Sequence, residues 1–122
     1  IVALFSQYSL ACKGPKSGEK YDALIKLEKL ANKNQYRVTV PRKLEELDDL
    51  QIKLSYPQAK IGGKFVSEPD ETLNPTFEAG MASAEFIVQK RGERIPYVLI
   101  TWWPEGCCRC GIQATSKYIE VE

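Results

Sequence analysis

The chain has 122 residues, of which 43% are hydrophobic and 27% are charged. These values are typical of a single folded globular domain and exclude a disordered chain. The formal net charge of +1 gives no indication of a nucleic-acid partner or of binding to an anionic membrane surface. No apolar run approaches the ~20 residues that a membrane-spanning helix needs, so we expect no membrane span.

Histidine is absent from the chain, which removes the commonest general base and the imidazole metal ligand. Any catalysis would therefore use thiols, carboxylates, lysines or tyrosines. Cys12 stands alone, whereas Cys107, Cys108 and Cys110 lie close together. A secreted disulfide scaffold would spread its cysteines more evenly, so we expect a reducing, intracellular environment, such as the cytoplasm.

The first half of the chain is predicted to alternate strands and helices. The apolar run at 2–6 predicts a buried strand. Apolar residues at helical spacing over 21–31 predict a helix, with Ser17 as its N-cap. Residues 36–40 alternate and are rich in β-branched side chains, so they predict a strand. Residues 41–51 begin with a proline, which helices tolerate best at their first position, and predict a second short helix.

The second half of the chain is predicted to begin with a β-hairpin. Residues 58–66 form its two arms, with the turn at Gly62 and Gly63. Residues 67–81 open on an acidic cluster, which is typical of a helix start, and predict a third helix. Residues 84–103 read as two strands on either side of a polar turn.

This order of elements resembles that of the glutaredoxin family over residues 1–82. The most specific part of the match is PQAKIGGKFV at 57–66, a spacing that in this family marks a cis-proline loop leading into a hairpin. The resemblance implies an α/β fold of the thioredoxin type, with a central mixed sheet and flanking helices. Residues 83–122 are then a C-terminal hairpin extension that carries the cysteine cluster.

The resemblance also implies a glutathione site. In this family the backbone next to the cis-proline binds the ligand, here Tyr56 beside Pro57, and the last helix has an acidic start, here Asp70 and Glu71. The alternative for the proline is an ordinary turn. The nucleophilic cysteine that opens the family's first helix is missing, and the nearest thiol is Cys12. That thiol is either a single reactive nucleophile or a buried structural cysteine.

The cysteine cluster near the end of the chain has two interpretations. Cys107, Cys108 and Cys110 could supply three soft thiolate ligands to zinc. They also faintly resemble the cysteine-rich hairpin of cysteine-rich glutaredoxin-domain proteins, although the upstream cysteine pair of that pattern is missing. The alternative is a set of free or disulfide-linked thiols.

Trp102 and Trp103 are adjacent, so in a strand they point to opposite faces. One can enter the core while the other stays at the surface. An exposed tryptophan beside Pro104 is a possible anchor for a protein partner. The alternative is that it covers a sheet edge.

The sequence therefore favours a non-catalytic, degenerate glutaredoxin-like module that acts in protein interaction, or as a structural part, within an intracellular assembly. The alternative is a thiol-disulfide oxidoreductase or glutathione-binding protein that uses Cys12. A remoter resemblance is to the actin-depolymerising homology fold, suggested by YVLITWWPEG followed by ATSK.

Overall fold

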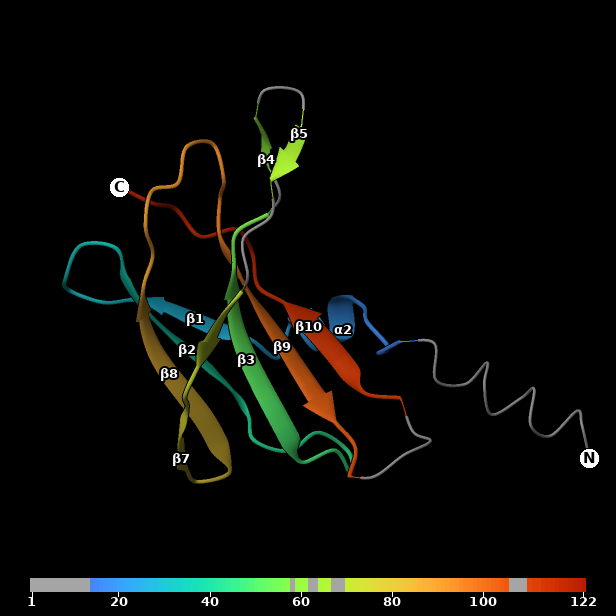
Figure 1. The fold of residues 1–122 in the computed structure, drawn as a ribbon. Coiled ribbons are helices and arrows are strands. Elements are labelled where there is room, and N and C mark those ends of the chain that lie inside the picture. Colours follow the sequence, from blue (N-terminus) through green and yellow to red (C-terminus); the bar gives the residue numbers. More distant parts are fainter. Residues whose placement is uncertain (1–13, 58, 62–63, 67–69, 106–109) are drawn as a thin grey trace, which may run out of the picture.

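The computed structural model describes residues 14–57, 59–61, 64–66, 70–105 and 110–122. Almost all of its regular structure is β-strand (Figure 1). The elements are helix α2 (Glu19–Asp22) and strands β1 (Lys26–Lys29), β2 (Gln35–Pro41), β3 (Asp49–Ser55), β4 (Ala59–Ile61), β5 (Lys64–Val66), β6 (Glu71–Leu73), β7 (Thr76–Glu78), β8 (Met81–Ile87), β9 (Tyr97–Trp103) and β10 (Ile112–Thr115).

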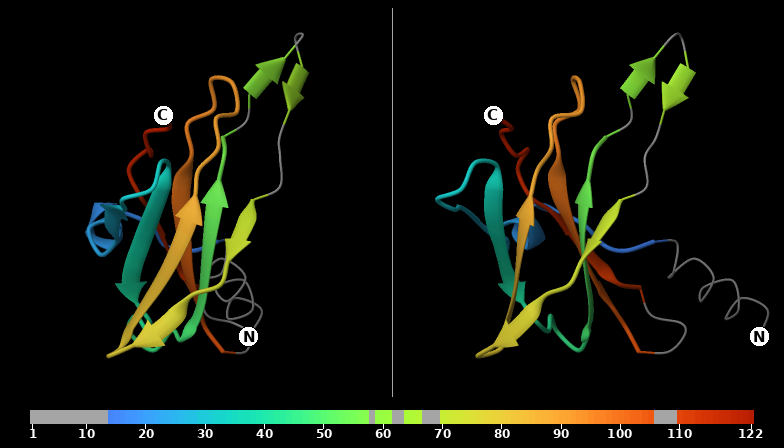
Figure 2. Two further views of the ribbon diagram at one scale, coloured as in Figure 1. Left: turned by 90° about the vertical axis from the view of Figure 1, so that its left-hand side faces the viewer. Right: turned by 60° about the vertical axis from the view of Figure 1, so that its left-hand side comes forward.

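The strands form two four-stranded sheets that face each other as the layers of a β-sandwich (Figure 2). One sheet has the order β1-β2-β8-β7 and the other has the order β10-β9-β3-β6. All the named strand pairs are antiparallel. Strands β4 and β5 pair only with each other and form a hairpin that projects from one end of the sandwich (Figure 1).

The chain passes between the two sheets three times, after β2, β6 and β8. The passage from β6 to β7 is the shortest, because only Asn74 and Pro75 separate the two strands. One nearly continuous segment therefore forms an edge of both sheets on one side of the sandwich (Figure 2). On the opposite side the sheet edges are β1 and β10.

The core lies between the sheets and follows from the alternation of the central strands. In β2, Tyr36, Val38 and Val40 are buried, whereas Arg37 and Thr39 point outward. This period of two is what a strand with one buried face requires. The fully buried side chains include Val38, Val40, Ile52, Leu54, Val98, Ile100, Trp102 and Ile112.

The expected α/β thioredoxin-like fold with flanking helices is wrong, because the described chain forms two antiparallel sheets. Of the helix predicted over 21–31, only Tyr21 and Asp22 are helical, as the end of α2, and Lys26–Lys29 form strand β1 instead. Within that stretch Ile25 and Leu27 alternate with Lys26 and Glu28, so the segment also has the period of a strand. Pairing with β2 selects that second period, because tertiary context overrides local helix propensity.

The other two predicted helices are also wrong. Residues 41–51 form a turn, closed by bonds between Leu44 and Leu47, and then the start of β3. In the third predicted helix, over 67–81, the described residues 70–81 form β6 and β7 instead of a helix. Pro75 lies between these two strands and cannot donate an amide hydrogen bond, which disfavours a helix through this position.

Several shorter predictions are confirmed. Residues 36–40 lie in β2, and the arms of the hairpin over 58–66 pair as β4 and β5. The two strands expected over 84–103 are β8 and β9, although they lie in different sheets. The strand expected at 2–6 and the hairpin turn at 62–63 lie outside the described residues.

Residue 82, where the two expected domains met, lies inside β8. Each four-stranded sheet includes residues from both sides of this position. Within the ranges that the structure describes, no helix has the length and apolar character to cross a membrane.

Candidate functional site

Residues 116–122, called the crossing segment below, continue from β10 over the end of the sandwich (Figure 1). The segment first extends the pairing with β9, since the amide of Ser116 donates to the carbonyl oxygen of Val98 at 2.9 Å. The amide of Ile119 then donates to the carbonyl oxygen of Pro96 at 2.8 Å. The Ile119 side chain is fully buried, so it anchors the segment in the core.

The crossing segment next reaches the other sheet. The Tyr36 hydroxyl donates to the carbonyl oxygen of Glu120 at 2.7 Å. Near the turn between β1 and β2, the Glu122 amide donates to Asn34 Oδ1 at 2.8 Å, and the Glu122 carboxylate pairs with Lys29. The segment therefore bridges both sheets at one end of the sandwich.

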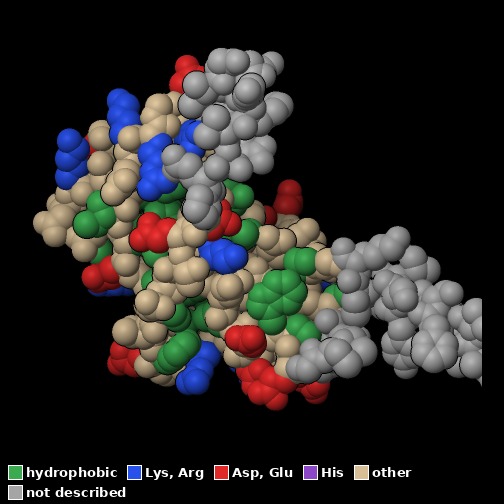
Figure 3. All heavy atoms as spheres, viewed as in Figure 1, with side chains coloured by type: hydrophobic (Ala, Val, Ile, Leu, Met, Phe, Trp, Pro, Cys, Tyr) green, Lys and Arg blue, Asp and Glu red, His purple; other side chains and the backbone are tan. Residues whose placement is uncertain are grey.

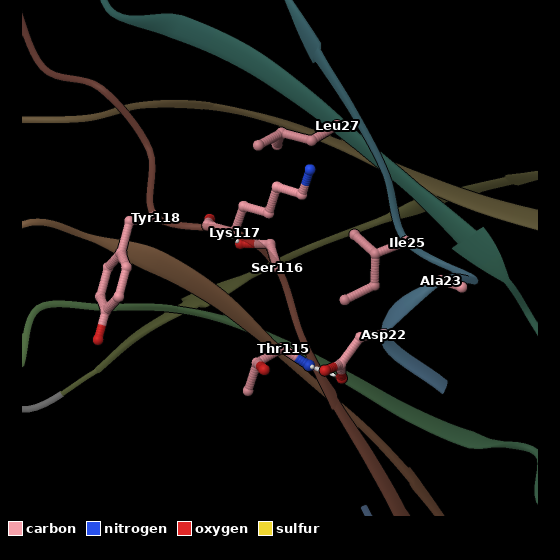
Figure 4. A pocket seen from close by; sticks show the side chains of 8 residues that line it. All are labelled: Asp22, Ala23, Ile25, Leu27, Thr115, Ser116, Lys117 and Tyr118. Atoms are coloured by element: carbon pink, nitrogen blue, oxygen red, sulfur yellow. Dashed lines mark hydrogen bonds between the residues drawn. The ribbon is translucent and has the colours of Figure 1, made fainter. Parts of the chain in front are cut away.

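A cleft of about 650 Å³ lies between the α2–β1 region and the crossing segment (Figure 4). We call it the lysine cleft. Ile25 and Leu27 project into it from the side of β1 and give it an apolar wall, and the Lys117 side chain extends toward Leu27 (Figure 4). Its lining is Asp22, Ala23, Ile25, Leu27, Thr115, Ser116, Lys117 and Tyr118.

The far wall of the lysine cleft is held in place by α2 and the residues before it. The Thr115 amide donates to Asp22 Oδ1 at 2.9 Å, which ties α2 to β10. Lys16 runs alongside β10, where its amide donates to the Gly111 carbonyl oxygen and its carbonyl oxygen accepts from the Gln113 amide. The outer edge of β10 is thus already occupied by hydrogen-bonding partners.

A second cleft of about 300 Å³ adjoins the first, and we call it the tyrosine cleft. The rings of Tyr97 and Tyr118 meet edge to face with their centroids 6.0 Å apart. Tyr118 borders both clefts and is 68% exposed. The lining of the tyrosine cleft is Pro57, Tyr97, Thr115, Ser116 and Tyr118.

Two polar side chains lie at the junction of the two clefts, and they differ in whether they bind other groups of the chain. The Ser116 hydroxyl accepts from the Val98 amide at 2.8 Å and donates to the Lys117 carbonyl oxygen at 2.8 Å. That hydroxyl therefore serves the local fold. The Lys117 ammonium forms no salt bridge with any residue that the structure describes. The two clefts thus offer apolar walls, an exposed phenol and a cation, which suit binding.

The shifted pKa values belong to surface ion pairs that include neither Lys117 nor Tyr118. The hydrogen bond with Glu122 raises the pKa of Lys29, and the same bond lowers the pKa of Glu122. The hydrogen bond with Glu85 raises the pKa of Arg37. These shifts report attraction between opposite charges in the folded chain.

The residues predicted for the proline loop have different surroundings from those expected. Tyr56 is buried, its hydroxyl accepts from the Gln89 amide at 2.8 Å, and the Arg91 guanidinium lies 4.1 Å from its ring centroid. Pro57 lines the tyrosine cleft. No cis peptide bond occurs among the described residues, so the expected cis-proline is wrong.

The other predicted ligand residues do not join these clefts. Asp70 and Glu71 are exposed at the start of β6, and neither lines the lysine cleft or the tyrosine cleft. Cys12, Cys107 and Cys108 lie outside the described residues, whereas Cys110 is half-buried. Within the described ranges, no group of three or more cysteine or acidic residues is arranged to hold a metal. The reactive thiol and the zinc site therefore stay predictions.

The two tryptophans lie on opposite faces of β9, as their adjacency predicts. Trp102 has no exposed surface, and its indole N–H donates to the Pro41 carbonyl oxygen at 2.8 Å. Trp103 is 38% exposed, and its indole N–H donates to Gln51 Oε1 at 3.4 Å. On the face viewed in Figure 3, hydrophobic side chains reach the surface among charged ones.

No binding role for Tyr97, Lys117 or Tyr118 follows from the sequence alone. A pattern of aromatic and basic residues after a strand was the only signal, and it does not reveal that the crossing segment returns beside β9. The resemblance to glutaredoxins rests chiefly on 57–66, and the fold that it implies is contradicted by the two antiparallel sheets. No protein-family model matches the chain, and no curated protein or solved structure does so either.

Proposed function

We propose that this chain is a recognition module that binds an extended segment of a partner protein across Tyr118. The observation that carries the proposal is the position of this ring, which is 68% exposed and borders two adjoining clefts. A segment that lies over the ring can place one side chain in each cleft. Tyrosine is enriched among the residues that dominate interface energies, because its ring covers a large area with few rotatable bonds.

The lining of the clefts defines the chemistry of the partner segment. Ile25 and Leu27 suit an aliphatic side chain, and the Lys117 ammonium suits a carboxylate next to it. In the tyrosine cleft, Pro57 and Tyr97 offer flat walls to a proline or another compact apolar residue. We therefore expect the partner to present an aliphatic residue beside an acidic one.

The frame around Tyr118 supports the proposal because it is ordered before a partner arrives. Tyr118 packs against Tyr97, and the next residue along the chain, Ile119, is buried. The Ser116 hydroxyl makes two hydrogen bonds that fix the start of the crossing segment. A preorganised site loses less conformational entropy on binding, so a given set of contacts yields a higher affinity.

Selection from a displayed library of random peptides on the purified chain would test this function. We expect the selected peptides to be enriched in aliphatic-acidic pairs. The affinity of the best peptide, measured by fluorescence anisotropy, should fall by about tenfold or more in Tyr118→Ala, the loss typical of an interface anchor. Lys117→Gln should lower the affinity for acidic peptides and reduce the salt dependence of their binding, because it removes the cation.

The matched control is Phe77→Ala, which removes a 50% exposed aromatic ring from β7, on the other side of the sandwich. It should leave peptide affinity unchanged. Peptides that bind Tyr118→Ala as well as the wild type would contradict the proposal. If Trp103→Ala lost binding and Tyr118→Ala did not, the peptide would bind at Trp103, the anchor that the sequence indicated, and not at Tyr118.

A further inference from the structure

Strand β1 lies at the edge of its sheet, and its pairing with β2 shows which main-chain groups face away. The Leu30 amide donates to the Gln35 carbonyl oxygen at 2.9 Å, just beyond the register pair of Lys29 with Tyr36. Hydrogen-bonded and non-hydrogen-bonded pairs alternate along an antiparallel ladder. Leu27 and Lys29 therefore direct their amide and carbonyl groups away from β2.

The edge strand β10, on the same side of the sandwich, is treated differently. Its outward amides at Gln113 and Thr115 are bound by the Lys16 carbonyl oxygen and by Asp22. The outward groups of Leu27 and Lys29 bind no group of the described chain. An edge strand with unpaired main-chain groups is a template for pairing with another strand.

The charges of β1 select a particular partner for this edge. Lys26 and Glu28 flank Leu27, and residues two apart in a strand share a face. If a second copy of β1 pairs antiparallel about Leu27, each Lys26 faces Glu28 of the other copy. A register centred on Glu28 would instead place two carboxylates opposite each other, which is destabilising. An edge of lysines alone would repel its own copy, whereas this pattern attracts it.

We propose that two copies of the chain associate through β1, with a two-fold axis at Leu27. The two Leu27 residues then exchange amide-to-carbonyl hydrogen bonds, because both groups already point outward. The Lys29 amide of each copy donates to the Ile25 carbonyl oxygen of the other. The β1-β2-β8-β7 sheets of the two copies then join into one continuous sheet of eight strands.

The existing contacts of the two charged residues are compatible with this pairing. Arg37 lies 2.6 Å from Glu85 and 3.2 Å from Glu28, so its shorter bond is to Glu85. Its bond to Glu28 uses only Oε1, which leaves Oε2 available to Lys26 of the second copy. Lys26 itself forms no salt bridge with a described residue.

Sedimentation equilibrium over a concentration series would test the dimer. We expect the wild type to dimerise reversibly. Lys26→Glu and Glu28→Lys should each raise the dissociation constant about tenfold or more, since each introduces two like-charge contacts. The double charge exchange K26E/E28K should restore dimerisation, because the pairs are reformed with reversed signs.

The matched controls are Lys43→Glu and Glu93→Lys, which make the same charge changes at exposed positions outside β1. Circular dichroism would verify that every variant is folded. A wild type that stays monomeric at all concentrations would overturn the proposal, as would a dimer that Lys26→Glu does not weaken. A double variant that remains as weak as the single ones would overturn the register.

Discussion

Gly111 shows how one missing side chain shapes the end of β9. A β-carbon at this position would lie 2.7 Å from the Trp102 carbonyl oxygen and 3.0 Å from a ring carbon of Trp103. Both neighbours are constrained, because Trp102 is buried and the Trp103 indole is hydrogen-bonded to Gln51. The exposed tryptophan thus owes its orientation partly to a glycine that immediately precedes the neighbouring strand β10.

We expect Gly111→Ala to lower the free energy of unfolding by about 1–3 kcal/mol, the usual cost of overpacking. The clash involves a main-chain oxygen, so rotation of a side chain cannot relieve it. Urea denaturation followed by tryptophan fluorescence would measure the change. Gln113→Ala, two residues along the same region and half-buried, should have little effect. Equal stability of Gly111→Ala and the wild type would show that β10 can move away from β9.

The sequence correctly predicted that Trp102 and Trp103 face opposite sides of a strand, but it gave no indication of Tyr118 and Lys117. The tryptophans follow from alternation, which is a local property of any strand. The role proposed for Tyr118 rests on its position between clefts whose walls derive from the β1 side and from β9. No local pattern contains that information.

Helix α2 stabilises the fold mainly through one carboxylate. The helix is only four residues long and has no buried side chain. Asp22 nevertheless accepts a hydrogen bond from the Thr115 amide. It thereby covers an edge of β10 that would otherwise expose an unpaired donor. Covering of this kind also prevents unwanted strand addition at that edge.

Asp22→Ala should destabilise the fold by about 1–3 kcal/mol, since it removes a charge-assisted hydrogen bond and leaves a half-buried amide unpaired. Asp22→Asn should cost less, because the amide oxygen can still accept. Hydrogen exchange of the Thr115 amide, followed by NMR, gives a local readout and should accelerate in the alanine variant. Unchanged exchange in both variants would mean that the bond contributes nothing.

Some elements could be predicted from the sequence because their determinants are local. Buried and outward-facing residues alternate strictly along strand β2. In the sequence, the arms β4 and β5 flank a Gly-Gly pair, which is typical of a hairpin turn. The helix predicted over 21–31 failed because that stretch satisfies both periods, and only its pairing with β2 decides between them. The helix predicted over 41–51 failed because a proline, four acidic residues and three leucines suit a turn as well as a helix start.

The crossing segment joins the two sheets, and the ion pair between Glu122 and Lys29 makes the stability of this connection depend on pH. Lys29 lowers the pKa of the Glu122 carboxyl in the folded state. The corresponding stabilisation is complete above the unfolded pKa and is lost as the pH falls through the lower, folded value. For Lys29, whose pKa is raised, it is lost as the pH rises through the raised value.

We expect Glu122→Gln to be less stable than the wild type at neutral pH, by a small amount because the pair is exposed. The difference should disappear as the pH falls through the lowered pKa of Glu122. Urea denaturation of both proteins across the acid range would measure it. A stability difference that does not change with pH would mean that Glu122 acts through packing instead of charge.

The overall fold could not be predicted, because its central pairs join distant parts of the chain. Ile52 pairs with Ile100, and Val38 pairs with Ala84. The resemblance over 57–66 captured a real hairpin, but a hairpin is common to many folds and does not determine how the other strands pair.

The nearly continuous run from β6 to β7 has a consequence for how the sandwich can deform. It belongs to both sheets, so separating them on that side requires the breaking of strand pairs with β3 and β8. On the other side, between β1 and β10, no strand is shared by the two sheets. There the layers are joined by the Asp22 bond to the Thr115 amide and by the crossing segment. Because the lysine cleft lies on this side, the same contacts that hold the two sheets together there also fix the width of the cleft.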